Sequence, residues 1–331
     1  ALAAETFRLM DPVSQRMLAL RPDMTMQVAR IACSRLAHRP RPLRLGYSGQ
    51  VMRLRGTQLR PERQFGEVGA EIVGSDAAAA DVEVIVMAAT ALADLGVTGL
   101  TVDLGLPTLV PAILADDPVA PGVEDRLRLA LDRKDLAAIA AMAPVLGDAR
   151  AGLLTRLVAG NGPAEDALPT LLSLDLPPVA AAERARLVSV HEQLRHQLPS
   201  LTLTIDAVEN RGFEYHSGVT YALFAAAAPD EIGRGGRYQT ETGEASTGVT
   251  LFIASVMRAL SCPRSQRRLF LPLATDPETA RTLRGEGWIA VGALEEDIDI
   301  IAEAHRLGCT HVLIDGTPRP LETLVQRSAG G

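Results

Sequence analysis

The chain has 331 residues, of which 47% are hydrophobic and 22% charged, an ordinary composition for a globular protein with more than one domain. Its net charge of −7 argues against a large nucleic-acid-binding surface. No apolar run reaches the roughly 20 residues of a membrane-spanning helix, and the first residues, Ala1 to Asp11, lack the apolar core of a signal peptide. The three cysteines are far apart and form no metal-binding or disulfide pattern, so we expect a cytoplasmic protein without a metal or cofactor.

The N-terminal third predicts alternating helices and strands. Residues 12–38 are typical of a strand followed by a helix, with Thr25 as the N-cap of that helix. Residues 43–75 predict two antiparallel strands around a polar turn, because glycines and alternating apolar residues flank a charged stretch. A helix is expected over residues 80–96, closed by a glycine, and a further strand starts at Thr98.

The rest of the chain shows three successive sequence patterns: a helical stretch, a set of strands, and an alternation of strands and helices. Residues 107–200 are rich in alanine and leucine with charges at helical spacing, which predicts a helical segment. Strands are expected again at 201–207, 213–228 and 248–254. Residues 267–331 alternate strand and helix, which is typical of a small α/β unit with three parallel strands.

These patterns predict three domains. Residues 1–106 and 201–260 together form a core, residues 107–200 are inserted into it, and residues 267–331 form the C-terminal unit. The segment from Ser261 to Gln266 is the expected boundary.

Two segments place acidic side chains where they could meet a cation. In LRPDMT, Asp23 and Thr25 lie at a strand-to-helix junction and could hold a ligand ammonium, or they could simply cap the helix. In QFGEVGAEIVG, Glu67, Gly69 and Glu71 share one face of a strand, since side chains alternate faces. Two like charges beside a glycine make a poor core and a plausible cup for a cationic ligand, although a solvated sheet face would look the same.

Two glycine-rich segments follow after the helical stretch. RGFEYHSG runs from Arg211 to Gly218, and GRGGRY runs from Gly233 to Tyr238. Paired glycines permit a close approach of the backbone to a ligand, but they are also common in plain turns.

In this order, the four segments resemble the histidyl-tRNA synthetase family of class II synthetases. That family carries LRPEGT, an FR…RQFHQFGVE motif, RGLDYY and a GGRYD loop, with a helical insert between the second and third. The resemblance covers roughly residues 12–260. It implies an α+β fold in which a class II synthetase-like antiparallel sheet is flanked by helices, with a helical insert and a small C-terminal α/β unit.

The resemblance also implies a histidine pocket. It places the α-amino group near Asp23, Thr25 and Glu67, and the imidazole near Glu71 and the Tyr215–His216 pair. Two arginine positions of the family are kept as well. The implied histidine-binding residues are Asp23, Thr25, Arg53, Glu67, Glu71, Arg211, Tyr215 and His216.

The chain departs from the synthetases where they handle ATP. Their closing motif, similar to GFALGLERL, ends in an arginine that grips the phosphates, and here GVTLFIASV places Ser255 at that position. A serine hydroxyl cannot make a bidentate charged contact. We therefore expect no adenylate chemistry and no catalytic residue in this chain.

His216 is also absent from the synthetases, and RGFEYHSG resembles the RGxxYHTG-like segment of the regulatory subunits of short-form ATP phosphoribosyltransferase. That family acts in the first step of histidine biosynthesis. The resemblance implies a non-catalytic subunit that forms a homodimer within a hetero-oligomer with the catalytic subunit and takes L-histidine as feedback effector. It implies no tRNA partner, and the acidic residues 295–299 would repel tRNA phosphates.

Two other hypotheses remain at this point. One is a divergent histidine–tRNA ligase that is still active. The other is an amino-acid sensor with a different partner.

Overall fold

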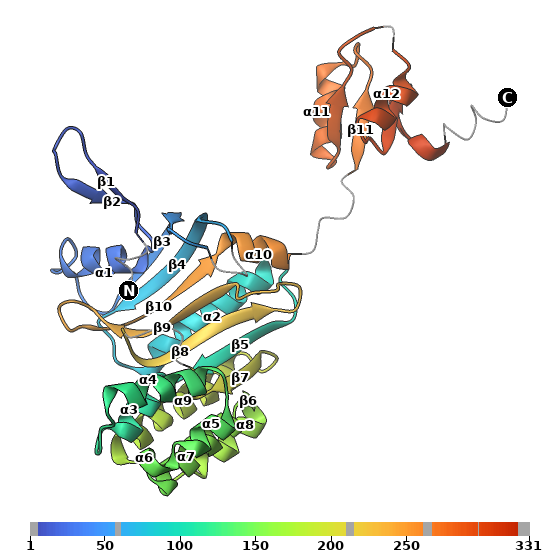
Figure 1. Ribbon diagram of the computed structural model, residues 1–331. Helices are drawn as coiled ribbons and strands as arrows, with labels where there is room; N and C mark the ends of the chain where they lie inside the picture. Colours follow the sequence, from blue (N-terminus) through green and yellow to red (C-terminus); the bar gives the residue numbers. More distant parts are fainter. Residues whose placement is uncertain (1–5, 57–60, 210–214, 261–266, 297, 324–331) are drawn as a thin grey trace. The chain divides into compact units, whose positions relative to one another are not determined.

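The computed structural model of the chain, drawn in Figure 1, describes residues 6–56, 61–209, 215–260, 267–296 and 298–323. It divides into two compact units, Ala1–Ser261 and Cys262–Gly331. The predicted boundary segment, residues 261–266, lies outside the described residues.

The described chain begins with a hairpin, whose second strand is the one predicted before the helix and whose first strand was not predicted. Strands β1 (Arg8–Met10) and β2 (Met17–Ala19) pair antiparallel, and all their residues are exposed. Helix α1 (Thr25–Cys33) follows. The prediction that Thr25 caps this helix is wrong: Met24 occupies the N-cap position without a side-chain bond, and the Thr25 hydroxyl lies 3.1 Å from the Tyr47 hydroxyl.

An eight-stranded sheet forms the framework of the larger unit, in the order β3-β4-β10-β9-β8-β5-β7-β6. Its strands are β3 (Leu43–Met52), β4 (Gln64–Val73), β5 (Leu100–Gly105), β6 (Gly162–Pro163), β7 (Thr202–Asp206), β8 (His216–Ala225), β9 (Gly233–Gln239) and β10 (Ala245–Phe252). All neighbours pair antiparallel except β5 and β7, which are parallel. The sheet is therefore mixed rather than purely antiparallel, and the GRGGRY segment is strand β9 rather than a loop.

Helices cover one face of this sheet. Helix α2 (Ala78–Asp94) packs under β10 and against α9 (Pro178–Gln197), and its buried side chains belong to the main core. It ends as predicted, because Gly96 adopts φ +93° directly after the last turn. A short helix, α10 (Ile253–Ala259), continues from β10.

The segment between β5 and β7 is mainly helical, as predicted. Its elements before α9 are α3 (Leu109–Leu114), α4 (Pro121–Asp132), α5 (Leu136–Ala141), α6 (Ala143–Leu146), α7 (Asp148–Ala159) and α8 (Ala164–Leu172), with β6 inserted between α7 and α8. They gather on the same side of the sheet as α9 (Figure 1). The apolar residues of the predicted helical spacing are buried among them, for example Leu127, Leu154 and Leu187.

The smaller unit has a four-stranded sheet in the order β12-β11-β13-β14. Its elements are β11 (Arg268–Leu271), α11 (Pro277–Gly285), β12 (Ile289–Gly292), α12 (Ile300–Arg306), β13 (His311–Ile314) and β14 (Thr317–Pro320). The three predicted strands are parallel, but the antiparallel edge strand β14 was not predicted. None of the helices in the described part of either unit has the length and apolar character to cross a membrane.

Candidate functional site

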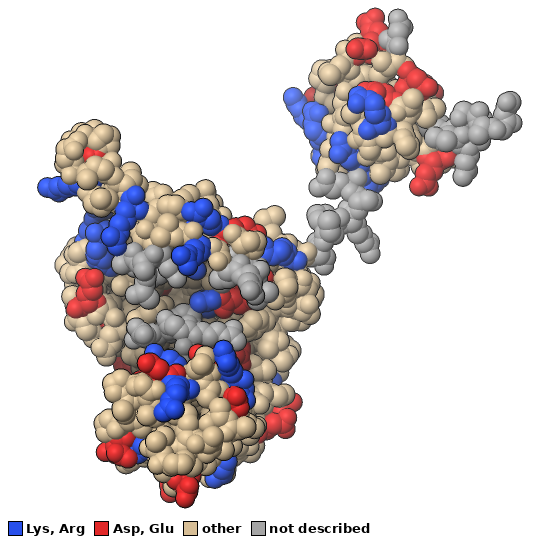
Figure 2. All heavy atoms as spheres, viewed as in Figure 1, with Lys and Arg blue, Asp and Glu red and all other residues tan. Residues whose placement is uncertain are grey.

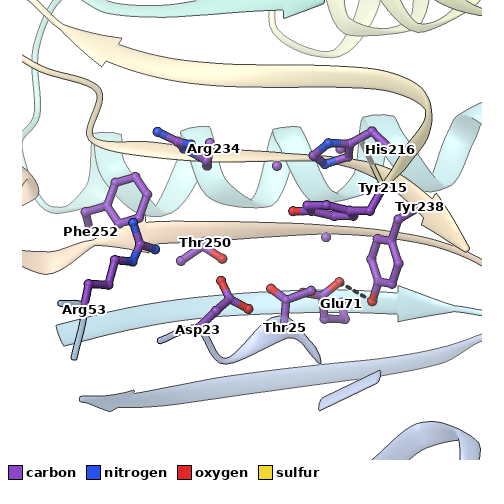
Figure 3. A pocket seen from close by; sticks show the side chains of 13 residues that line it. Asp23, Thr25, Arg53, Glu71, Tyr215, His216, Arg234, Tyr238, Thr250 and Phe252 are labelled. Atoms are coloured by element: carbon purple, nitrogen blue, oxygen red, sulfur yellow. Dashed lines mark hydrogen bonds between the residues drawn. The ribbon is translucent and has the colours of Figure 1, made fainter. Parts of the chain in front are cut away.

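A cavity opens on the face of the large sheet, and Figure 3 shows its side chains. It is bounded by the start of α1 and by strands β4, β8, β9 and β10. Six of the predicted residues line it: Asp23, Thr25, Arg53, Glu71, Tyr215 and His216. Four further side chains, which the sequence did not single out, line it as well: Arg234, Tyr238, Thr250 and Phe252.

Strand register brings these residues together. Glu71 on β4 lies opposite Gly248 on β10, and Gly248 lies opposite Gly236 on β9. A Cβ atom on Gly248 would overlap the Glu71 carboxylate. The glycine therefore leaves the space in which a buried acid can lie flat against the sheet.

The Glu71 carboxylate is the most buried acid of the cavity, with 1% of the residue exposed. The Tyr238 hydroxyl donates a hydrogen bond of 3.0 Å to its Oε2 atom. Burial raises the pKa of Glu71 to about 8, although hydrogen bonds from Thr25 and Tyr238 oppose that rise. With this pKa, Glu71 is largely protonated at neutral pH and can both donate and accept a hydrogen bond.

Hydroxyl groups surround the same acid. The Tyr47 hydroxyl lies 2.6 Å from the Thr250 hydroxyl and 3.1 Å from that of Thr25. Burial also raises the pKa of Asp23, while the backbone N–H of Met26 and the charge of Arg53 lower it. This end of the cavity thus offers two carboxyl groups and several hydroxyls to a ligand.

An aromatic pair forms the wall beside them. The rings of Tyr215 and His216 are stacked with centroids 4.2 Å apart, and Tyr238 meets Tyr215 edge to face. Burial, together with the nearby Arg234 cation, lowers the pKa of His216 to about 3. The His216 imidazole is therefore neutral at physiological pH, and one of its nitrogens can accept a hydrogen bond.

Arginines mark the opposite end of the cavity. Arg53 lines it, and its guanidinium lies 5.1 Å from the Phe65 ring centroid. Glu67, predicted to contact a ligand ammonium, does not line the cavity: it is buried at 3.5 Å from Arg53 and supports that side chain. Arg234 stands across from Arg53 (Figure 3).

Two other predicted positions lie elsewhere. Arg211 falls outside the described residues. Ser255 is fully buried on α10, where its hydroxyl donates a 2.9 Å hydrogen bond to Asp230, and it does not line the cavity. No cluster of metal-ligating side chains is present in the described ranges.

The surface charge around the site is uneven. In the space-filling view, arginines gather on the face of the larger unit around a hollow, and acidic atoms are visible within it (Figure 2). A small ligand that carries both a positive and a negative group suits such a surface.

Comparison with known proteins shows which families and structures the chain is similar to. The family model described as histidyl-tRNA synthetase matches residues 1–256. The ATP phosphoribosyltransferase regulatory subunit of Paramagnetospirillum magneticum is 55% identical over 94% of this chain and 81% of its own length. An ATP phosphoribosyltransferase regulatory subunit/histidyl-tRNA synthetase from Bacillus halodurans superposes with a TM-score of 0.75 at 26% identity, covering 92% of this chain and 82% of that one.

A third comparison concerns the fold alone. A chain of the ATP phosphoribosyl transferase (HisG:HisZ) complex from Thermotoga maritima superposes with a TM-score of 0.61 at 18% identity, covering 75% of this chain and 85% of that one. These likenesses confirm the expected α+β, synthetase-like fold.

Proposed function

Because the chain belongs to the family of ATP phosphoribosyltransferase regulatory subunits, we propose that its cavity binds free L-histidine and that the bound histidine regulates a catalytic partner. The chain is the regulatory, non-catalytic component of a phosphoribosyltransferase that serves histidine biosynthesis.

The observation that carries the proposal is the polarity of the cavity. Glu71 lies with Tyr215 and the neutral His216 at one end, where an imidazole can both donate and accept hydrogen bonds. Asp23 and Thr25 lie nearer the middle and suit an ammonium group (Figure 3). A site that pairs both imidazole nitrogens can reject isosteres lacking them by about 10⁴.

The partner is a catalytic subunit of ATP phosphoribosyltransferase. The Thermotoga maritima protein that shares the fold is part of a HisG:HisZ complex, and this supports a hetero-oligomer here. We propose that tRNA is not a partner.

Within that assembly, the chain forms a homodimer. The β1–β2 hairpin exposes a run of large apolar residues: Leu9, Met10, Val13, Met17 and Leu18, from 42% to 90% exposed. Exposed apolar patches of this kind favour a protein interface, and a second copy of the chain is the occupant we propose.

Isothermal titration calorimetry with L-histidine tests the binding directly. We expect a single site, and much weaker binding of glutamine or phenylalanine. Glu71→Gln should weaken histidine binding roughly 10- to 100-fold, since an imidazole N–H that donates to Glu71 favours the ionised carboxylate, and a charged hydrogen bond contributes about 1.5–3 kcal/mol. The matched control is Glu83→Gln, an exposed acid paired with Arg44 away from the cavity, which should leave the affinity unchanged. Equal affinity in the Glu71 variant and the wild type would remove Glu71 from the site.

A further inference from the structure

Arg234 lines the cavity and is not among the histidine-binding residues that the synthetase resemblance implies. It lies on β9 directly opposite Thr250 on β10, and both side chains face the same space. About a third of its side chain, 32%, is exposed. It is therefore accessible to a ligand and also held in place by the sheet.

Two contacts fix its guanidinium. Arg234 forms an ion pair with Glu231, three residues earlier in the chain. Its guanidinium also lies over the Phe252 ring, 5.6 Å from the centroid. An arginine anchored in this way loses less side-chain entropy when it binds a ligand.

Arg53 is held by a matching set of contacts from another strand. It is paired with Glu67 and lies over Phe65, with 22% of its side chain exposed. Phe65 and Phe252 meet edge to face at 6.2 Å, so one aromatic pair supports both arginines. Figure 3 shows both arginines at the end of the cavity away from Glu71, with Phe252 and Thr250 beside them.

Building on the proposed histidine site, we infer that Arg234, together with Arg53, binds the carboxylate of the amino acid and makes the cavity select amino acids over amines. A guanidinium carries five N–H donors in a planar fork, so it can hold a supporting carboxylate and a ligand carboxylate at once. Two neighbouring cations repel each other unless an anion joins them. Asp23 lies between the two ends of the cavity, where it can pair with the ammonium group of the bound amino acid (Figure 3).

Histamine is histidine without its carboxylate, so comparing the two ligands separates recognition of the carboxylate from recognition of the imidazole and the amine. The wild type should bind histidine roughly 10- to 100-fold more tightly than histamine, because histamine makes no charged bond to the arginines. Arg234→Met should weaken histidine binding by about that factor and leave histamine binding unchanged. Arg234→Lys, which keeps the charge but not the planar fork, should fall between the two.

The experiment is calorimetry with both ligands on the full chain, with Arg44→Met as the matched control because Arg44 is an exposed arginine paired with Glu83. Unchanged histamine affinity in the Arg234→Met protein also shows that the cavity is folded. A histidine-to-histamine ratio that stays at the wild-type value in both Arg234 variants would overturn the inference while leaving the histidine site intact. If the wild type binds neither ligand, the proposed function itself fails and this inference fails with it.

Discussion

Glu71 carries its carboxyl group on a strand, under a tyrosine hydroxyl and beside a glycine that leaves room for it. Burial alone would be costly for an ionised acid, and the surrounding hydroxyls compensate for only part of that cost. The carboxyl therefore keeps its proton to a higher pH than an exposed glutamate does.

This proton links stability to pH. The pKa of Glu71 is about 8 in the folded chain against 4.5 as the ordinary value. Between these values the folded state holds a proton that the unfolded state has lost, so stability falls as pH rises, by at most about 1.4 kcal/mol per pH unit. We predict that Glu71→Gln lowers this slope between pH 5 and pH 8. Urea unfolding of the ligand-free proteins at several pH values measures it, and identical slopes in the two proteins would contradict the prediction.

Ser255 leads to a second prediction at this scale. Its side chain is buried and bonded to Asp230, so the position offers a ligand neither charge nor access. We expect pyrophosphate exchange with histidine and ATP to remain at background. An authentic histidyl-tRNA synthetase assayed in parallel is the positive control. Exchange at a rate comparable to that control would restore the hypothesis of an active ligase.

Only some of the residues that line the cavity could be predicted from the sequence. Asp23, Thr25 and Glu71 were found through the resemblance to the synthetase motifs, because an acid or hydroxyl at these positions could equally cap a helix or face solvent. Arg234 and Tyr238 share one face of β9 with Gly236, and a glycine-rich segment that could equally be a turn gives no faces from which to predict this. Phe252 could not be found at all, since only strand pairing places it beside Phe65.

At the scale of elements, Arg237 joins strand β9 to helix α2. It is 2% exposed, and its guanidinium donates to Asp81 at 2.9 Å and to the backbone oxygens of Ser75 and Ala77. Asp81 is itself fully buried. The ion pair therefore fixes the start of α2 beneath the sheet that carries the cavity.

We predict that Arg237→Met destabilises the chain by about 3–5 kcal/mol, because it leaves the Asp81 charge buried without its partner. Arg44→Met removes a pair whose side chains are 58% and 46% exposed, and should change stability by less than about 1 kcal/mol. Urea unfolding of both variants at pH 7 compares them. Similar midpoints for the two variants would mean that the buried pair does not hold the helix in place.

The β1–β2 hairpin allows a test of the homodimer. Met17 and Leu18 are 60% and 46% exposed on a strand with no further partner among the described strands. Replacing both by aspartate should shift the mass measured by light scattering from dimer to monomer, because a charge buried in an apolar interface is costly. A double substitution of the exposed Leu129 and Leu136 by aspartate, in the helical segment, is the matched control and should leave the mass unchanged. A dimer that survives the hairpin change would place the interface elsewhere.

Elements with a clear periodicity were predictable and the others were not. Strand β3 alternates over ten residues, β4 follows it after a charged stretch of sequence, and α2 has helical spacing closed by a glycine, so all three were found. Strand β2 was expected within residues 12–38, but β1 has only three residues and β14 has four, two of them proline. Such short runs carry too little pattern to identify. The parallel β5–β7 pair was missed for another reason, because a strand's direction in a sheet depends on the route of the chain between its strands.

At the scale of the whole molecule, histidine can regulate a partner only if binding at the cavity and at the partner interface are coupled. Such couplings typically amount to 1–3 kcal/mol, a factor of roughly 5 to 150 in affinity, and they are reciprocal. If histidine inhibits the catalytic subunit by weakening binding of the phosphoribosyl donor, that donor must weaken histidine binding to this chain by the same factor. We predict this shift for the assembled complex and no shift for the isolated chain.

The measurement is a histidine titration of the complex with and without a saturating phosphoribosyl donor. The matched variant is Glu71→Gln in the same complex, which should raise the histidine concentration needed for half-inhibition by the factor it costs in binding. That agreement matters because it ties inhibition to this cavity rather than to a second histidine site on the partner. If the histidine affinity is the same with and without the donor, the chain binds histidine but does not use it to regulate the catalytic subunit. Inhibition that is indifferent to Glu71 would place the effector site on the catalytic subunit.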